Sequence, residues 1–272
     1  MTILRSTSRQ ALLIILAILS LYPMWFIVTT ALKTPAGYAL DPTGLPHHLT
    51  LSNFSAIFSQ WPFLTWVRNS VVATLVSVVV ATFISIMAAF AIVFGTARAR
   101  ETFLRTNIAL MAIPPVALLT PMYTLMVELH LINQLPAVMI FYCGLLVPFS
   151  IFFFVNFFRQ IPHELVEAAY IDGARPSRVM LRVIMPISGA STFTLVIVNA
   201  IFVWNELLIA LVFLQNNNSR TLMAGIALYQ GRYITNEPLI MAAAFLSLLP
   251  LLVLYVLGQR FFVRGMTAGM GR

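Results

Sequence analysis

The sequence predicts an all-α membrane protein with six transmembrane helices. Charged residues make up 9% of the chain and apolar residues 60%, whereas about a quarter of the residues of a soluble domain are charged. The apolar residues form blocks long enough to cross a membrane, which the core of a soluble protein does not need. The basic residues stand between these blocks. One membrane domain is therefore predicted.

Six segments are long enough, at about 1.5 Å per residue, to cross a hydrocarbon layer of roughly 30 Å. They cover approximately residues 11–32, 70–94, 106–127, 135–158, 191–214 and 239–258. Prolines within these spans predict kinked helices whose free carbonyls are satisfied by neighbours in a bundle. Examples are Pro23, Pro114, Pro115, Pro121, Pro148 and Pro250.

The basic residues predict the orientation. If the connections alternate across the membrane, one side receives twelve Arg residues and the other receives three Arg and Lys33. By the positive-inside rule both termini and the 159–190 connection are cytoplasmic, and 33–67, 128–134 and 215–238 lie outside. Arg5 and Arg9 resemble the start of a signal peptide, but no small-residue cleavage site follows the apolar run. The first span is therefore expected to be a retained anchor helix.

Three divisions of the chain follow from these spans. Residues 1–66 hold the anchor helix and the first external loop, residues 67–259 a transmembrane domain of five helices, and residues 260–272 a cytoplasmic tail. Within the transmembrane domain, the 159–190 connection is longer than a link between two helices needs to be. It is therefore expected to have a function of its own.

Composition and motifs argue against several function classes. The net charge of +8 is spread singly between apolar blocks, so no nucleic-acid partner is expected. The lone Cys143 and the four histidines show no metal-ligand spacing. No nucleophile, base and orienting group occur together, and the G-x-x-x-x-G-K-[ST] phosphate loop is missing. We therefore expect no enzyme activity, no metal site and no cofactor in this chain.

The 159–190 connection carries the signals of a short helix. Pro162 suits a first helical position, Glu164 suits the positive end of the helix, and Gly173 suits the left-handed residue that ends it. A helix over 162–172 is predicted. A second helix is expected to start at Pro176 and to end near Pro186, where the next span begins.

Two roles are open for the first of these helices. It could lie on lipid headgroups, in which case its polar face would be basic. Its polar residues include Glu164, Glu167 and Asp172 instead, which anionic headgroups repel. Ala168 and Ala169 share a face with Leu165 and Asp172 and keep that face shallow enough to seat in a groove. These features favour a helix that docks on another protein.

The spacing in this connection also resembles a known motif. Glu167-Ala168-Ala169, three residues, Gly173, nine residues and Val183-Ile184-Met185-Pro186 resemble the EAA loop of membrane subunits of binding-protein-dependent ABC importers. That family usually has Ile and Leu where Val183 and Met185 stand, and often a further proline where Ala190 stands. The resemblance implies a coupling helix seated in a cleft of the ATPase subunit, with an interface formed by Glu164, Glu167, Ala168, Ala169, Asp172, Gly173 and Pro186.

The resemblance extends to the carbohydrate importers, in particular to the maltose-system G-type subunit. Trp204-Asn205-Glu206 with Leu207-Leu208, and the segment 259–269, are similar to that subfamily. The resemblance implies the type I importer permease fold and import of a carbohydrate or polyol delivered by an extracytoplasmic solute-binding protein. It implies three further kinds of partner, namely a homologous second permease, two ATP-binding subunits that hold ATP and Mg, and the lipid of a bacterial or archaeal cytoplasmic (inner) membrane.

Glu206 is the acidic residue placed well inside a predicted span, where a charge costs on the order of 3 kcal/mol or more. In one interpretation Asn199, Trp204, Asn205 and Glu206 line the translocation pathway and contact a hydroxyl-rich solute. In the other, which we favour, Glu206 and Asn205 hydrogen-bond a neighbouring helix or backbone and hold the bundle together. Both interpretations are carried forward.

The alternative function is a secondary transporter or channel subunit for a small polar solute. Such proteins show repeated halves, matched glycine interruptions or several ionisable groups in the membrane. This sequence has one such group, Glu206, which favours the ATP-driven importer.

Overall fold

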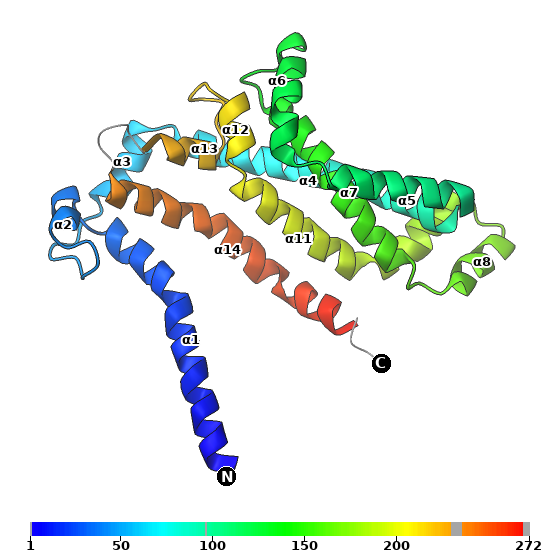
Figure 1. Ribbon diagram of the computed structural model, residues 1–272, viewed down its shortest axis with the longest axis horizontal. Helices are drawn as coiled ribbons and strands as arrows, with labels where there is room; N and C mark the ends of the chain where they lie inside the picture. Colours follow the sequence, from blue (N-terminus) through cyan, green and yellow to red (C-terminus); the bar gives the residue numbers. More distant parts are fainter. Residues whose placement is uncertain (1, 96, 230–235, 269–272) are drawn as a thin grey trace. The chain divides into compact units, whose positions relative to one another are not determined.

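The computed structural model describes residues 2–95, 97–229 and 236–268, and these residues form helices and no strand (Figure 1). In chain order the elements are α1 (Thr2–Ala31), α2 (Pro35–Leu40), α3 (Ser52–Gln60), α4 (Phe63–Phe94), α5 (Ala97–Met111), η1 (Pro115–Leu118), α6 (Leu119–Glu128), α7 (Leu135–Phe158), α8 (His163–Ile171), α9 (Pro176–Val179), η2 (Met180–Ile184), α10 (Met185–Ile187), α11 (Gly189–Asn205), α12 (Leu208–Phe213), α13 (Leu222–Ile226), η3 (Ala227–Tyr229) and α14 (Glu237–Ala268).

The spans agree with the prediction of six. Four of the described helices are long and apolar enough to cross a membrane on their own, within the ranges Leu12–Ala31, Phe63–Phe94, Leu135–Phe158 and Glu237–Val256. Two bent helix pairs bring the number to six when each pair is counted as one span. The bounds of α7 match the predicted span 135–158. Helix α14, which contains the sixth span, continues to Ala268. Most of the predicted tail, residues 260–272, is therefore part of this helix, and the last four residues of the tail lie outside the described ranges.

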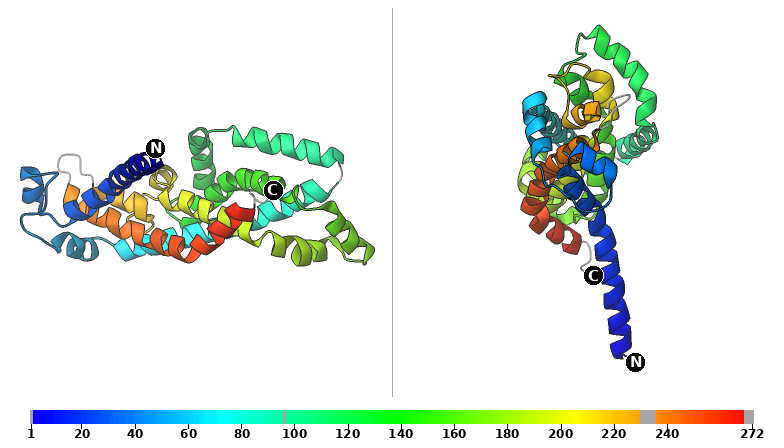
Figure 2. Two further views of the ribbon diagram at one scale, coloured as in Figure 1. Left: turned by 90° about the horizontal axis from the view of Figure 1, so that it is seen from below. Right: turned by 90° about the vertical axis from the view of Figure 1, so that its left-hand side faces the viewer.

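The third predicted span, 106–127, is not one helix. Helix α5 begins earlier, at Ala97, and the pair Arg100–Met111 and Pro115–Glu128 is bent by 89°. Pro114 and Pro115 have no N–H for the preceding carbonyls, so an α-helix cannot continue through them. The corner between α5 and α6 is visible in the left view of Figure 2.

The fifth predicted span, 191–214, is also broken. Helix α11 ends at Asn205, Glu206 has an extended conformation, and α12 begins at Leu208. A second sharp bend of 77° separates Pro176–Ile187 from Gly189–Asn205, at the entry to this span. Since Glu206 stands at the first of these breaks, its role depends on what satisfies the interrupted backbone.

The chain divides into two compact units, and the smaller one comprises Met1–Thr65 and Gly225–Pro250. In this unit polar side chains cap the end of α1. The Asn53 amide donates hydrogen bonds to the carbonyls of Ala31 and Lys33, both at 2.8 Å, and the Lys33 ammonium donates to the carbonyls of Asp41 and Pro42. Orphan carbonyls at the end of an apolar helix are thereby satisfied.

The larger unit comprises Trp66–Ala224 and Leu251–Arg272. Helix α7 is its centre, because α5, α11 and α12 all pack against it. One apolar cluster joins α4, α6, α7, α11 and α12 around Tyr142 and Phe213. A second cluster joins α4 and α7 to the 159–190 connection around Phe154 and Phe158. The connection is therefore packed onto the bundle by its own core.

Candidate functional site

The structure contains the short helix predicted for residues 162–172, which is α8, and its docking role stays a prediction. Helix α8 covers His163–Ile171, with Pro162 at the N-cap position and Asp172 at the C-cap position. Pro162 thus stands one residue before the helical position expected for it. Glu164 lies in the first turn, where a carboxylate is favoured by the N–H groups of the helix end.

Gly173 ends this helix as the sequence predicts. Its φ is +76°, and the region that a Cβ would occupy is empty. The N–H of Ala174 donates to the carbonyl of Ala169 and the N–H of Gly173 to that of Tyr170, both at 3.0 Å. These two bonds form a Schellman motif, which needs a left-handed residue after the C-cap. Gly173 therefore fixes the direction in which the chain leaves α8.

The two sides of α8 differ in exposure. Val166 is 3% exposed and belongs to the apolar cluster with Phe158, while Ala169 packs against its edge. Leu165 and Ile171 are exposed by 47% and 86%. Glu164, Glu167, Ala168 and Asp172 are exposed as well. Helix α8 is therefore held by one side and offers short apolar and acidic side chains on the other.

The second half of the connection forms a continuous but uneven helical segment. It runs through α9, the wide turn η2 and α10, and the N–H of Met185 donates to the carbonyl of Met180, five residues earlier. Pro186 follows, exposed, as the second residue of α10. The wider turn fits a proline that has no N–H for the carbonyl of Arg182. Val179 and Ile184 anchor this segment to the same cluster as Val166.

Glu206 binds the start of a helix. Its carboxylate accepts hydrogen bonds from the N–H of Ile209 at 2.8 Å and the N–H of Ala210 at 3.2 Å, both in α12. The Tyr142 hydroxyl of α7 donates to the same carboxylate at 2.7 Å. These are the partners that the structural interpretation of Glu206 requires, namely a neighbouring helix and free backbone groups.

Two of the other candidate pathway residues, Asn199 and Asn205, donate hydrogen bonds within the protein. Asn199 is buried, and its amide donates to the Ser150 hydroxyl of α7 at 2.9 Å. Trp204 is buried, while Asn205 is exposed and its amide donates to the carbonyl of Ile201 within α11. Their contact with a solute stays a prediction.

Three partners in these polar contacts were not predicted from the sequence. Tyr142 holds Glu206, Ser150 accepts from Asn199, and the Asn133 carboxamide oxygen accepts from the N–H groups of Gln215 and Asn216 at 2.6 and 2.8 Å. Asn133 has a φ of 65°. A polar residue within or beside an apolar block signals a need for a partner, but the spacing along the chain does not reveal which residue it is.

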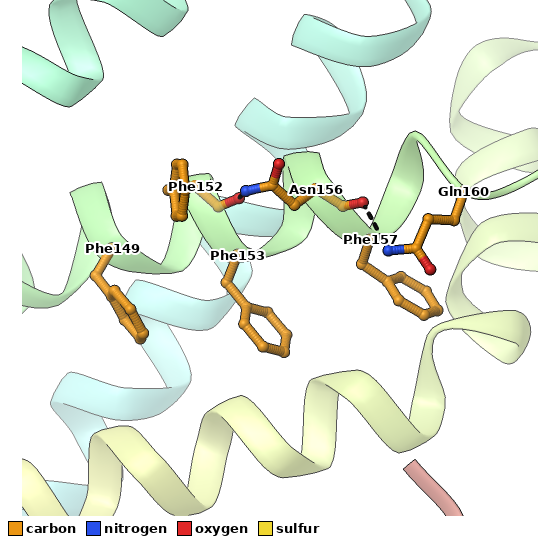
Figure 3. A pocket seen from close by; sticks show the side chains of 6 residues that line it. All are labelled: Phe149, Phe152, Phe153, Asn156, Phe157 and Gln160. Atoms are coloured by element: carbon orange, nitrogen blue, oxygen red, sulfur yellow. Dashed lines mark hydrogen bonds between the residues drawn. The ribbon is translucent and has the colours of Figure 1, made fainter. Parts of the chain in front are cut away.

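The C-terminal half of α7 carries an aromatic surface. Figure 3 shows the side chains that line a shallow cavity of about 230 Å³ there: Phe149, Phe152, Phe153, Asn156, Phe157 and Gln160. The two amides donate to carbonyls of α7, Asn156 to Phe152 and Gln160 to Asn156. This surface leads directly to the start of the 159–190 connection.

Together these features define a class of protein. The chain is a multi-pass α-helical membrane protein with two broken spans and an exposed, glycine-terminated helix between its fourth and fifth spans. It belongs to the family described as the binding-protein-dependent transport system inner membrane component, whose model matches residues 81–268.

Curated relatives cover nearly the whole chain. It is 36% identical to the sulfoquinovosyl glycerol transport system permease protein SmoH of Agrobacterium fabrum, over 94% of this chain and 90% of that protein. It is 31% identical to the arabinooligosaccharides transport system permease protein AraQ of Halalkalibacterium halodurans, over 82% and 80%. It is 30% identical to the trehalose/maltose transport system permease protein MalG of Thermococcus litoralis, over 94% and 93%.

Solved structures show the same fold. A chain of a bacterial ABC transporter involved in the import of the polysaccharide alginate matches with a TM-score of 0.77 and 20% identity, over 95% of this chain and 96% of that one. A chain of the MetNI methionine ABC transporter matches with a TM-score of 0.60 and 20% identity, over 76% and 97%. The fold is therefore that of an ABC importer permease.

Proposed function

We propose that this chain is one permease subunit of an ATP-driven importer for a carbohydrate or related polyol. The observation that carries the proposal is the exposed helix α8, which is anchored to the bundle on one side and free to contact a partner on the other. The matched family consists of inner membrane components of binding-protein-dependent transport systems. Helix α8 follows α7 after four residues and leads into α11 through α9 and α10. A push on α8 would therefore reach two spans directly.

Carbohydrate is the substrate class that the relatives support. SmoH, AraQ and MalG are named for the transport of a sulfosugar glycoside, arabinooligosaccharides and trehalose or maltose. The relatives differ among themselves in solute, so the choice within this class stays open. Sugars, oligosaccharides, polyols and glycerol phosphodiesters are all candidates.

The proposed assembly places each partner on a different surface. Two ATP-binding subunits, which hold ATP and Mg, would lie on the cytoplasmic side, and α8 would seat in a cleft of one of them. A homologous permease would complete the membrane domain, and a solute-binding protein would deliver the solute from outside. Both termini would be cytoplasmic, in a bacterial or archaeal inner membrane, as the distribution of Arg and Lys predicts. ATP binding would then shift the pair of permeases between inward- and outward-facing states.

The energy source tests this proposal. The complex would be reconstituted in vesicles with the binding protein outside, and uptake of labelled sugar measured with ATP enclosed and with proton and sodium gradients abolished. We expect uptake that needs enclosed ATP. Uptake that persists without ATP and collapses with the ion gradients would favour the secondary transporter instead.

The acidic surface of α8 offers a second test. Glu167→Lys should weaken association with the ATP-binding subunits, most visibly at low salt, because it reverses a charge on the docking surface. Glu101→Lys is the matched control, since Glu101 is exposed on α5 and forms a surface pair with Arg105. Co-purification of the subunits would measure both. If the two variants associate equally with the ATP-binding subunits, the proposal that α8 lies at this interface is wrong.

A further inference from the structure

A cavity of about 480 Å³ lies between α6 and α12 in the larger unit. Leu119, Thr120, Tyr123 and Thr124 form one wall, and Val212 and Gln215 form the other. Its volume falls within the usual range for small-molecule sites. Both walls lie near the helix ends that the predicted topology places outside, since α6 ends at Glu128 and α12 at Phe213.

The lining combines an aromatic ring with uncharged hydrogen-bonding groups. Tyr123 is half-buried, and its ring is held edge-on against Phe213 at 6.0 Å between centroids. Its hydroxyl makes no hydrogen bond with the residues that the structure describes. The Thr124 hydroxyl donates to the carbonyl of Thr120, and the Gln215 amide donates to that of Val212. The oxygens of both side chains can still accept from a solute.

The α12 wall of the cavity is held at both ends. At its start, Glu206 accepts from the N–H groups of Ile209 and Ala210. At its end, Asn133 accepts from the N–H groups of Gln215 and Asn216, and donates its own N–H to the carbonyl of Phe213. A wall fixed in this way keeps its contacts in place before a solute arrives, which lowers the cost of binding.

Two other cavities of this unit lack this combination. The space of about 520 Å³ between α4, α5 and α7 is lined mainly by alanine, isoleucine, leucine and phenylalanine, and the amide of its Asn107 already donates to the carbonyl of Pro148. The shallow aromatic surface of α7 is lined by two amides that donate to carbonyls of α7. The α6–α12 cavity adds a free aromatic hydroxyl to acceptor oxygens and carries no charge.

We propose that the α6–α12 cavity is a contact site for a neutral, hydroxyl-rich solute crossing the membrane. Tyr123 offers a rigid aromatic face for the C–H groups of a sugar ring and a hydroxyl for one of its oxygens, while Thr124 and Gln215 accept from its hydroxyls. The absence of charged groups from this lining selects against anions and cations. The inference rests on the proposed function. It places the contact between the protein and its solute at α6 and α12 instead of at Asn199 and Asn205.

Occupation of the cavity can be measured directly. Thr120→Cys in a Cys143→Ser background would be labelled with a membrane-impermeant thiol reagent in the reconstituted complex. The probe would be whichever of labelled trehalose, maltose and raffinose the wild type imports with ATP. That sugar should slow labelling of Thr120→Cys, whereas Asn217→Cys, exposed on the neighbouring external loop, should be labelled at the same rate with and without it.

Transport by matched variants completes the test. Tyr123→Phe and Thr124→Val keep the packing but remove hydroxyls, so each should reduce uptake by about three- to tenfold, as expected for a lost hydrogen bond. Thr194→Val is the control, because the Thr194 hydroxyl makes the same bond to a carbonyl four residues earlier in α11. If all three variants take up the sugar normally and the sugar does not slow labelling of Thr120→Cys, this inference is overturned and the proposed function still stands. Wild-type uptake of the sugar that persists without ATP and collapses with the ion gradients would overturn it together with the proposed function.

Discussion

Two helix ends in this protein are stabilised in opposite ways. Helix α8 ends at Gly173 in the connection that is predicted to be cytoplasmic, and its carbonyls are satisfied by the two N–H groups that follow. Helix α12 begins inside an apolar segment, and its N–H groups are satisfied by Glu206, which Tyr142 of another helix holds. The first end needs a residue with the right backbone freedom. The second needs a partner from 64 residues away in the chain.

The difference follows from the solvent around each end. In water an unpaired backbone group can bond to a water molecule, so a local motif suffices. Within the hydrocarbon each unpaired group costs several kcal/mol, and the chain itself must supply the partner. A carboxylate that bonds two backbone N–H groups and a hydroxyl is then less costly than its charge suggests. Glu206 therefore holds a broken span together.

The largest expected effect concerns the sides of the membrane on which the two regions lie, because accessibility is all or none. Single cysteines at Ser177, beside α8, and at Asn217, beyond α12, would be introduced in a Cys143→Ser background; both native side chains are exposed. An impermeant thiol reagent should label Ser177→Cys only from the inside and Asn217→Cys only from the outside. The reverse pattern would break the comparison and the proposed docking role together.

The next largest effect is on the stability of the protein when the start of α12 loses its partner. Glu206→Leu removes three hydrogen bonds, and at roughly 0.6 kcal/mol each it should lower the free energy of unfolding by about 2 kcal/mol. Glu206→Gln keeps an acceptor and should lose about half as much. Reversible unfolding in detergent micelles would measure both, with exposed Glu128→Leu as the control. No difference between Glu206→Leu and the control would refute the capping role.

Asn133 separates backbone conformation from side-chain bonding at the other end of α12. Asn133→Ala loses two accepted hydrogen bonds and strains a residue at φ 65°, whereas Asn133→Gly loses the bonds alone. We expect losses in unfolding free energy of about 2 and 1 kcal/mol, since each variant loses two hydrogen bonds at roughly 0.6 kcal/mol each and alanine adds about 1 kcal/mol of backbone strain. If glycine is as harmful as alanine, the positive φ contributes nothing and the amide alone holds the loop.

The smallest effect is expected for Tyr142→Phe, which removes one hydroxyl from Glu206 and keeps the buried ring. The loss should be about 0.6 kcal/mol, the average for a hydrogen bond between membrane helices. A double-mutant cycle with Glu206→Gln would measure the coupling between the two side chains. A coupling of zero would show that the two side chains contribute independently to stability.

These two regions also show what the sequence could predict. The bounds of α7, the position of α8 and the positive φ of Gly173 follow from apolar length, helix-end signals and turn chemistry, all of which are local. Pro114 and Pro115 predicted a kink, but its angle depends on how α5 and α6 pack. The break at Glu206 could not be located, because an apolar segment that runs past a break looks the same as an unbroken span. Its cause lies in Tyr142 and in the N–H groups of α12.

The central claim is that α8 transmits the force of ATP hydrolysis, and Gly173 tests it most directly. A Cβ meets nothing within 4 Å at Gly173 or at Gly189, but only Gly173 among the described glycines has a positive φ. Gly173→Val should therefore misdirect the exit of α8 while Gly189→Val should not. Both should insert normally, and in reconstituted complexes uptake and binding-protein-stimulated ATP hydrolysis would be measured side by side. The account predicts that Gly173→Val loses most uptake per ATP hydrolysed and that Gly189→Val keeps it. Equal and normal coupling in both variants would contradict it.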